Sequence, residues 1–362
     1  MIYRAIGLMS GSSLDGLDIA FAEFTETGGK WNYQIVEAGC IPYTNEWKMA
    51  LAASVNLPAL DYQLLHTAYG HYTGETVNNF IDKYNLHHQV HLIASHGHTS
   101  FHLPAKKMTA QLGDGAAIAA ATKLPVVSDL RSLDVAFGGQ GAPIVPIGEK
   151  LLLGDFSYYL NIGGIANISV NNSGYIAYDV CAANRILNLL AAEKGMEYDD
   201  GGKLAASGKI NEGLLYELNA MSYYSKPFPK SLDNSFGTDT IYPLIRNKNL
   251  SAEDALCTYT EHVAVQISYA LLQHAQFAAP QKLLVTGGGA FNTYLIQRLE
   301  EKLAKNNIAV HLPDEKLIKY KEALIMALIG VLRWREEVNV LSSVTGATES
   351  SIGGALWLGA AG

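Results

Sequence analysis

The sequence predicts a two-domain α/β protein, and three observations support this. The chain has 362 residues, more than one ordinary domain core accommodates. Short apolar strands alternate with helical segments, as in parallel crossover units. A strand, a glycine turn and a second strand open the chain and recur at 158–170. We place the boundary just after the glycine-rich segment 137–143, giving domains at 1–145 and 146–334, with about 335–362 returning to the first.

The composition narrows the class of protein further. Hydrophobic residues make up 49% and charged residues 17% of the chain, which suits a large buried core rather than a disordered or fibrous protein. The net charge is −8 and no basic stripe is present, so nucleic acid is not an expected partner. Cys40, Cys181 and Cys257 show neither disulfide nor metal-ligand spacing, which suits a reducing compartment.

Neither a signal peptide nor an apolar run long enough to span a membrane is visible in the sequence. We therefore expect a soluble, cytoplasmic protein without a membrane partner.

The first domain is expected to begin with a hairpin, because two β-prone runs flank a Gly/Ser/Asp turn. A helical region follows, in which Leu60, Leu64, Leu65, Ala68 and Tyr72 recur near the 3.6-residue period. The expected elements are strands at 3–9, 17–24 and 33–41, the helical region at 46–84, a strand at 91–94, a helix at 116–122 and a strand at 125–128. Residues 95–99 and Asp129 follow two of these strands, and ligand sites of crossover units lie beyond the carboxyl ends of strands.

The second domain repeats the pattern of the first without close sequence identity. A hairpin at 158–162 and 165–170 is followed by a β-prone segment at 175–178 and later by further helices and strands. We expect helices at 184–192, 212–221, 252–275, 294–305 and 321–331, and strands at 282–286 and 309–312.

Three glycine-rich turns, each after an apolar strand, are the candidate phosphate and nucleoside site. Successive backbone N–H groups can hold a phosphate where no Cβ blocks the approach, and a carboxylate such as Asp15 can hold Mg²⁺ directly or through water. Neither a Walker loop nor a dinucleotide fingerprint is present. The candidate ATP ligands are Gly11, Ser12, Ser13, Asp15 and Gly16 in the first turn, Gly163 and Gly164 in the second, and Gly287, Gly288, Gly289 and Asn292 in the third. A single glycine-rich turn after a strand is more often a tight turn than a ligand-binding loop.

An ordered set of motifs resembles the anhydro-N-acetylmuramic acid kinase family over nearly the whole chain. It begins with Leu8-Met9-Ser10-Gly11-Ser12-Ser13-Leu14-Asp15-Gly16, where Ser12 replaces the usual threonine. The other segments that carry the resemblance are 95–99, 111–115, 127–131, 138–143, 161–167, 205–208 and 287–292.

The resemblance implies a two-domain actin-like (ribonuclease H-like) ATPase fold with an interdomain cleft, using Mg-ATP and a sugar. It implies that water opens the anhydro ring of 1,6-anhydro-N-acetylmuramic acid while O6 receives the γ-phosphoryl group, a cell-wall recycling step. The family's catalytic aspartate matches Asp179 and the asparagine that follows it matches Asn184. The family's Thr-Gly-Pro-Gly between them is Val-Cys-Ala-Ala at 180–183 here.

Asp179 is expected to be the catalytic base, because a carboxylate at this position could take the proton of the attacking water. The alternative is that it only caps the helix expected from Asn184. A second departure lies at 229–235, where Pro229, Lys230 and Ser231 match the family but the acidic-basic pair that follows is lost. The second domain is therefore the diverged half.

The sugar site is expected to include His96, His98, Asp129, Arg131, Asn167 and Glu322. Arg131 could pair with the lactyl carboxylate of the substrate through its forked guanidinium, or it could form a salt bridge with Asp129 or Asp134. Glu322 could lie near the phosphates or merely favour a helix start. Asp114 could hold Mg²⁺ or stabilise a turn. His96, His98 and His102 lack a nearby cysteine or acidic partner that would complete a zinc site.

Two other functions compete with the leading one. The protein could be a related sugar kinase with a changed acceptor, or an ATP-binding module that has lost catalysis. The family tends to dimerise, and the sequence leaves the oligomeric state open.

Overall fold

The computed structural model describes residues 1–11, 13–171, 175–228, 230–233, 235–275 and 280–360. The chain forms two compact units, Met1–Leu153 with Tyr320–Gly362 (unit 1) and Gly154–Lys319 (unit 2). Helix α12 (Glu315–Trp334) is kinked at Tyr320, where the chain returns to unit 1. Residues 146–153 and 320–334, which the sequence analysis assigned to the second domain, thus lie in unit 1.

Unit 1 is built on a seven-stranded sheet, in which six strands run in the order β12-β6-β4-β1-β2-β3 and β5 pairs with β4. The hairpin β1–β2 is antiparallel, whereas β4 runs parallel to both β1 and β6. The strands are β1 (Ile2–Ser10), β2 (Gly16–Thr27), β3 (Lys30–Pro42), β4 (Leu92–Leu103), β5 (Met108–Leu112), β6 (Val126–Ser128) and β12 (Ala355–Trp357).

Helices cover both faces of this sheet. One face carries Ile6, Leu8 and Ile93, which share a core with residues of α2 and α3. On the opposite face, Gly7 leaves room for the backbone of α12, which passes directly above it at Ala323. The helices of unit 1 are α1 (Asn45–Ala53), α2 (Ala59–Tyr84), α3 (Gly115–Thr122), α4 (Ser132–Ala136), α5 (Pro146–Leu152), the part of α12 from Tyr320, and α13 (Ser342–Thr345).

Unit 2 has a five-stranded sheet in the order β11-β10-β7-β8-β9. The long helix α10 is buried along most of its length, and its Tyr259 and Val263 share one core with the sheet residues Leu160 and Val285. The elements are β7 (Tyr158–Ile162), β8 (Ile165–Val170), β9 (Ile176–Ala182), β10 (Gln281–Thr286) and β11 (Ile308–His311), with helices α6 (Asn184–Ala192), α7 (Lys203–Ser207), α8 (Glu212–Asn219), α9 (Tyr242–Arg246), α10 (Ala252–Leu272) and α11 (Thr293–Leu303).

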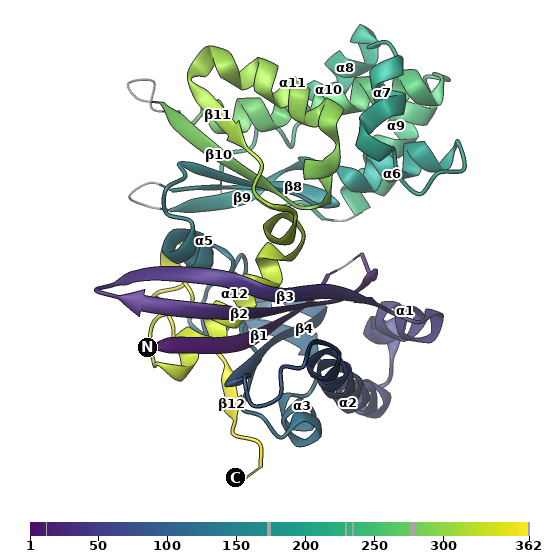
Figure 1. Cartoon of the computed structure of the whole chain (residues 1–362). Coiled ribbons are helices and arrows are strands. Elements are labelled where there is room, and N and C mark those ends of the chain that lie inside the picture. The colour runs from purple at the N-terminus through teal and green to yellow at the C-terminus, as the bar shows by residue number, and fades with distance from the viewer. Residues whose placement is uncertain (12, 172–174, 229, 234, 276–279, 361–362) are drawn as a thin grey trace. The chain divides into compact units, whose positions relative to one another are not determined.

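The two sheets have the same topology, and Figure 1 shows each sheet with the helices of its own unit. In each, three antiparallel strands from consecutive hairpins lead into two parallel strands reached by crossovers, β3-β2-β1-β4-β6 in unit 1 and β9-β8-β7-β10-β11 in unit 2. This duplicated arrangement confirms the predicted actin-like (ribonuclease H-like) fold class. None of the helices in the described residues is long and apolar enough to cross a membrane.

The structure corrects several element predictions. The helical region at 46–84 is two helices, because the chain breaks between Ser54 and Pro58. Leu60 and Leu64 are 70% and 60% exposed, so the apolar period did not mark the buried face of α2. That face instead contains Gly70 and Gly74, where α3 packs too closely for a larger side chain.

Two strands extend further than predicted. β4 continues through 95–99 to Leu103, because it pairs with β5 as well as with β1. β9 includes Asp179 and ends at Ala182, so Asp179 lies within a strand rather than after one, and the helix-cap alternative is wrong.

Candidate active site

The first glycine turn connects β1 to β2 in unit 1. Gly11 borders open space, whereas a side chain at Gly16 would meet the β3 backbone at Ile41. Ser13 and Asp15 are exposed, and the Asp15 carbonyl accepts a hydrogen bond from the Tyr43 amide at 3.2 Å. Ser12 lies outside the described residues. The turn thus leaves Gly11, Ser13 and Asp15 accessible to a ligand, whereas Gly16 is required for packing.

Carboxylates gather beside this turn. Burial raises the pKa of Asp18 to about 6, with the charges of Glu322 and Asp15 adding to the effect and a hydrogen bond with the Cys40 thiol opposing it. Burial also raises the pKa of Glu322, against the charges of Lys321 and Arg131. The neighbouring Lys321 is paired with Glu149 at 2.7 Å in the interior. Asp18 was missed by the sequence analysis, although it follows the recognised turn by only two residues.

His98 lies next to the first turn. Its Nδ1 is 3.0 Å from the Ser10 hydroxyl, and Ser10 also accepts a hydrogen bond from the Tyr43 hydroxyl at 2.7 Å. All three side chains are buried. The structure therefore places His98 as a support for the end of β1.

His96 of β4 contacts Arg131, which lies at the start of α4. The Nε of Arg131 donates to Nε2 of His96 at 2.7 Å, and Nδ1 of His96 lies 2.8 Å from the Gly97 carbonyl. An imidazole that accepts at Nε2 and donates at Nδ1 is neutral. Burial, together with the charge of Arg131, lowers the pKa of His96 to about 3, in agreement with this hydrogen-bond pattern.

Arg131 is held by neutral acceptors. Besides His96, it donates from Nη1 to the Gly141 carbonyl at 2.6 Å. Within the described residues it forms no salt bridge with Asp129 or Asp134, so that alternative is wrong. Burial lowers its pKa to about 10, which still leaves it charged at neutral pH.

The two aspartates beside Arg131 have other partners. Asp129 accepts from the Ser132 hydroxyl at 2.5 Å, and Asp134 accepts from the Gly141 amide at 2.7 Å. Asp134 thereby holds the loop whose carbonyl contacts Arg131.

The second and third glycine turns lie in unit 2. Side chains at Gly163 and Gly164 would meet no atom closer than 3.5 Å, so the β7–β8 turn borders open space. In the third turn Gly288 is similarly open, whereas Gly287 has φ +83° and packs against Asn161, and Gly289 packs against Ile162. Asn292 caps α11 by accepting from the Leu295 amide at 3.0 Å. Gly163, Gly164 and Gly288 are therefore the accessible backbone positions.

Asn184 joins the second and third turns. Its amide donates to the Gly163 carbonyl at 3.0 Å and its side chain donates to the Ile162 carbonyl at 3.0 Å, next to Gly288 and Gly289. From the sequence, Asn184 is identified only as a match to the family pattern. Its position directly after a strand and at the start of a helix was the sequence feature that could have identified it as a site residue.

Asp179 is held by the segment that runs beside β9. Its amide donates to the Lys230 carbonyl at 3.0 Å, and its Oδ2 accepts from the Leu232 amide at 3.0 Å. Its carbonyl accepts from the Tyr223 hydroxyl at 2.8 Å. Burial raises the pKa of the carboxyl group, and the Leu232 hydrogen bond partly offsets this.

A row of polar residues crosses the unit 2 sheet. Thr286 pairs with Asn161, Asn161 with Asn167, and Asn167 with Asp179, on four adjacent strands. Directly paired residues point to the same face, with Cβ atoms about 5 Å apart. The register therefore brings Asn167 next to Asp179, as expected if both belong to one site.

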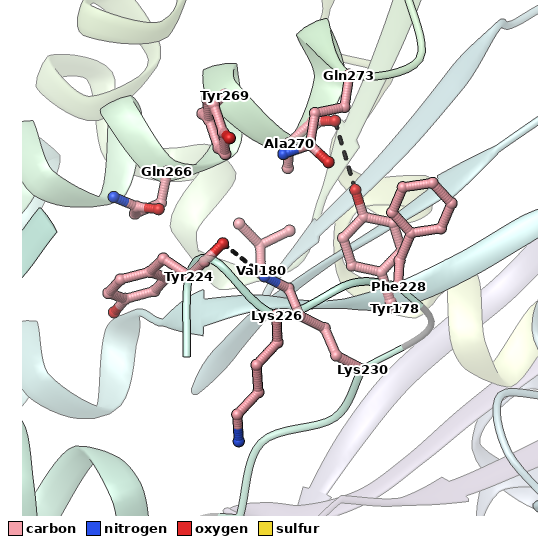
Figure 2. Close-up of a pocket in the computed structure, with 10 residues that line it drawn as sticks. All are labelled: Tyr178, Val180, Tyr224, Lys226, Phe228, Lys230, Gln266, Tyr269, Ala270 and Gln273. Carbon is pink, nitrogen blue, oxygen red and sulfur yellow. Dashed lines mark hydrogen bonds between the residues drawn. The ribbon is translucent and has the colours of Figure 1, made fainter. Parts of the chain in front are cut away.

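The other face of β9 borders a small pocket (Figure 2). Tyr178 stacks on Phe228 with ring centroids 5.5 Å apart, and its hydroxyl donates to the Ala270 carbonyl at 3.4 Å. Lys230 donates from Nζ to the Tyr224 carbonyl at 3.1 Å. The pocket volume is about 10 Å³, which is room for one water molecule. These contacts stabilise the segment that holds Asp179 and offer no ligand site.

No group of three or more potential ligands among the histidines, cysteines and acidic residues of the described ranges is arranged to hold a metal ion. His96 and His98 have their Nδ1 atoms engaged by Gly97 and Ser10.

Comparison with known proteins identifies the family. The model of the anhydro-N-acetylmuramic acid kinases matches residues 3–359. The chain belongs to this family. The anhydro-N-acetylmuramic acid kinase of Zymomonas mobilis is 34% identical over 320 residues, covering 83% of this chain and 84% of the relative. That of Vibrio parahaemolyticus is 33% identical over 370 residues, covering 97% of each chain.

A solved structure also matches most of the chain at low similarity. The activator of 2-hydroxyisocaproyl-CoA dehydratase from Clostridium difficile, with bound ADPNP, has 14% identity and a TM-score of 0.47, covering 92% of this chain and 96% of that one. The assignment to the anhydro-N-acetylmuramic acid kinase family comes from the sequence relatives, which confirm the predicted resemblance.

Proposed function

We propose that this protein is an ATP-dependent kinase that converts 1,6-anhydro-N-acetylmuramic acid, water and ATP to N-acetylmuramic acid 6-phosphate and ADP. Family membership over residues 3–359 supports this reaction. The observation that carries it in the structure is Asp179, a partly buried carboxylate at the position where the family has its catalytic base. The expected cytoplasmic location agrees with the use of ATP.

In this mechanism Asp179 acts as the general base. Water attacks C1 of the sugar and gives its proton to the carboxylate, the bond between C1 and O6 breaks, and O6 takes the γ-phosphoryl group as ADP leaves. The Leu232 amide holds Oδ2 at 3.0 Å and fixes the orientation of the carboxylate. Burial raises the carboxyl pKa and makes the carboxylate a stronger base than an exposed aspartate.

Two sets of residues would bind the substrates. The open turns at Gly11, Gly163 and Gly288 would hold the phosphates and nucleoside of ATP through backbone N–H groups. Arg131 would pair with the lactyl carboxylate, since its held guanidinium suits that planar group.

Asp15 and Asp18 are the residues that would hold Mg²⁺. Oxygen ligands are what this cation requires. Asp15 is exposed beside the first turn and lies near enough to Asp18 for their charges to interact, so a cation between them would relieve this repulsion. The ion would neutralise negative charge on the phosphates when bound.

Contacts of the altered segment at 180–183 support the proposed role of Asp179. Cys181, Ala182 and Ala183 are buried and pack into the core of unit 2. The turn into α6 is held by backbone contacts, including a hydrogen bond from the Ala183 amide to the Gly164 carbonyl at 2.8 Å. Because these bonds do not require the glycines and proline of the family, the substitutions are compatible with the proposed reaction.

Release of ADP, coupled to NADH oxidation, tests the proposal. We expect release with 1,6-anhydro-N-acetylmuramic acid and none with ordinary hexoses or hexosamines. Release only with a non-anhydro sugar would mean a changed acceptor. Binding of ATP without release for any sugar would mean a binding module that has lost catalysis.

A further inference from the structure

The side chain of Lys230 has no part in the proposed mechanism, yet its backbone pairs directly with Asp179. The Lys230 carbonyl accepts from the Asp179 amide at 3.0 Å. From Nζ, Lys230 donates to two consecutive carbonyls, that of Tyr223 at 3.2 Å and that of Tyr224 at 3.1 Å. Figure 2 shows the second of these bonds. One residue thus connects the strand of Asp179 to the turn that contains Tyr223 and Tyr224.

The residues that Lys230 connects supply two hydrogen-bond donors to Asp179. The Tyr223 hydroxyl donates to the Asp179 carbonyl at 2.8 Å, and the Leu232 amide donates to Oδ2 of the carboxylate at 3.0 Å. Leu232 lies two residues after Lys230, whereas the Tyr223 carbonyl accepts directly from the Lys230 side chain. Loss of the Nζ contacts would therefore weaken both holds on Asp179 at once.

The aromatic ring of Tyr223 fixes the Lys230 side chain. Nζ of Lys230 lies 4.7 Å from the centroid of this ring, within the range of a cation–π interaction. Tyr223 is buried, and its ring packs on Tyr224 and Phe236 with centroids 5.6 Å apart in each case. Because the ring is held in the core, the Lys230 side chain has a defined position, unlike a solvated surface lysine.

A buried histidine anchors Tyr224. The Tyr224 hydroxyl donates to Nε2 of His262 at 2.9 Å, and Nδ1 of His262 donates to Oδ1 of Asn219 at 2.7 Å. An imidazole with this pattern is neutral, and burial lowers the pKa of His262 to about 3, in agreement. Asn219 ends α8 and His262 lies within α10. The contacts of Lys230 are thus fixed to two helices of unit 2.

The ionisable groups around Asp179 bear on its titration. Burial raises the pKa values of Cys181 and Tyr223, and the charge of Asp179 adds to both effects. Burial lowers the pKa of Lys230. Burial raises the pKa of Asp179 itself, and the hydrogen bond from Leu232 opposes this effect. Since the thiol and the phenol stay protonated in acid, weakening of the Leu232 bond should be visible as a higher pKa of Asp179.

We propose that Lys230 is a positioning residue for the catalytic base, because its Nζ contacts with the Tyr223 and Tyr224 carbonyls hold Asp179 in the orientation that attack by water requires. Lys230 acts through Tyr223 and Leu232 and takes no proton itself. The inference rests on the proposed kinase function and adds to it the residue that keeps the base in place.

Lys230→Met in the full-length protein is the test variant, and Lys226→Met is the matched control. Nζ of Lys226 also lies over the Tyr223 ring, 5.8 Å from its centroid, but forms no hydrogen bond within the part of the chain that the structure describes. The exposed Lys226 side chain extends away from the bond between Lys230 and Tyr224 (Figure 2). The control therefore removes a lysine from the same ring without removing the contacts with the carbonyls.

Steady-state ADP release gives the first readout. We expect Lys230→Met to lower kcat by roughly 10- to 100-fold, as for a misplaced catalytic group, with KM for ATP near the wild-type value. Lys226→Met should retain the wild-type kcat. Lys230→Arg keeps the charge and the donors, so it should recover most of the loss.

Two measurements without substrate do not depend on turnover. In protein labelled with ¹³C at the aspartate carboxyl carbon, the NMR signal of Asp179 is the one missing from Asp179→Asn. We expect the pKa of Asp179 to rise in Lys230→Met, because the Leu232 hydrogen bond that lowers it is weakened. The Leu232 amide should also exchange its hydrogen faster in this variant. Lys226→Met should change neither quantity.

Tyr223→Phe is a second variant that keeps the ring beneath Lys230. It removes only the hydroxyl that donates to the Asp179 carbonyl. We expect kcat to fall by roughly 3- to 10-fold, the effect of one neutral hydrogen bond, with KM for ATP unchanged. Thermal unfolding shows whether each variant is folded.

The outcomes separate positioning from the reaction. Unchanged kcat and unchanged Leu232 exchange in Lys230→Met, or equal losses in Lys226→Met, would overturn the proposal. A raised pKa of Asp179 with unchanged Leu232 exchange would assign the effect to the lost charge of Lys230 and would also overturn it. If Lys230→Met does not fold, a wild-type kcat in Tyr223→Phe would have the same consequence. The expected changes in pKa and exchange, found in a protein whose wild type releases no ADP with any sugar, would support the hold on Asp179 and refute the kinase reaction.

Discussion

Replacement of His96 by leucine tests how Arg131 is oriented. The substitution removes the acceptor that lies 2.7 Å from the Arg131 Nε and leaves this partly buried, charged donor without that partner. A hydrogen bond to a charged group contributes about 1.5–3 kcal/mol. Since a tenfold change corresponds to about 1.4 kcal/mol, we expect KM for the acidic sugar to rise by about 10- to 150-fold.

The assay for this prediction is steady-state ADP release with 1,6-anhydro-N-acetylmuramic acid as the varied substrate. His96→Gln is the matched control, because its side-chain carbonyl can again accept from Arg131. We expect it to recover most of the lost affinity. KM for ATP should stay near the wild-type value in both variants, because the proposed ATP ligands lie elsewhere.

The pH dependence adds a second criterion. Because the pKa of His96 is lowered to about 3, its imidazole stays neutral over the whole pH range of the ADP-release assay. The ratio of wild-type to His96→Leu KM values should therefore be constant between about pH 6 and pH 9. A wild-type KM in His96→Leu, or a ratio that varies with pH as a histidine titrates, would refute the proposed orientation of Arg131.

Three further predictions follow from the structure. Asp179→Asn should retain ATP binding, measured by calorimetry, and lose turnover by at least about 100-fold. Normal turnover in this variant would remove Asp179 as the base. In the wild-type protein, turnover should fall as the pH drops through the raised pKa of Asp179, because the base must be deprotonated. The midpoint of this fall should lie above the ordinary aspartate pKa of 3.8. Lys321→Met should lower the free energy of unfolding in urea by about 3–5 kcal/mol, because it removes the buried cation that lies 2.7 Å from the Glu149 carboxylate. Lys321→Met combined with Glu149→Leu should recover part of this loss, and additive losses would contradict the pairing. Gly289→Ala should destabilise the third turn because its Cβ would overlap Ile162, whereas Gly163→Ala should leave the unfolding free energy nearly unchanged; equal effects in thermal unfolding would contradict the packing described for these turns.

Local patterns predicted most of the secondary structure. The hairpin strands β7 and β8 and the helix α6 have the expected limits, because each is bounded by glycine or by a break in apolar pattern. The burial of α2 could not be predicted from its apolar period. Leu60 and Leu64 are exposed there, and the close approach of α3 depends on Gly70 and Gly74 instead.

The candidate site was predicted by residue type and motif, whereas the partners of each residue depend on long-range contacts. His96 and Arg131 are 35 residues apart in sequence, so no local pattern shows that one orients the other. Asp179 likewise depends on Leu232, 53 residues away. Gln111 gave no signal by itself, because only its buried Oε1, which has no hydrogen-bond donor among the described residues, distinguishes it from an ordinary strand residue.

Mass spectrometry of the product tests the proposed reaction without a coupled assay. When the protein is incubated with 1,6-anhydro-N-acetylmuramic acid and Mg-ATP, we expect a sugar product heavier than the substrate by one HPO₃ and one H₂O, formed in equal amount to ADP. A product that has gained HPO₃ alone would show phosphorylation without opening of the anhydro ring. That result, or an unchanged sugar in the presence of bound ATP, would contradict the proposed reaction.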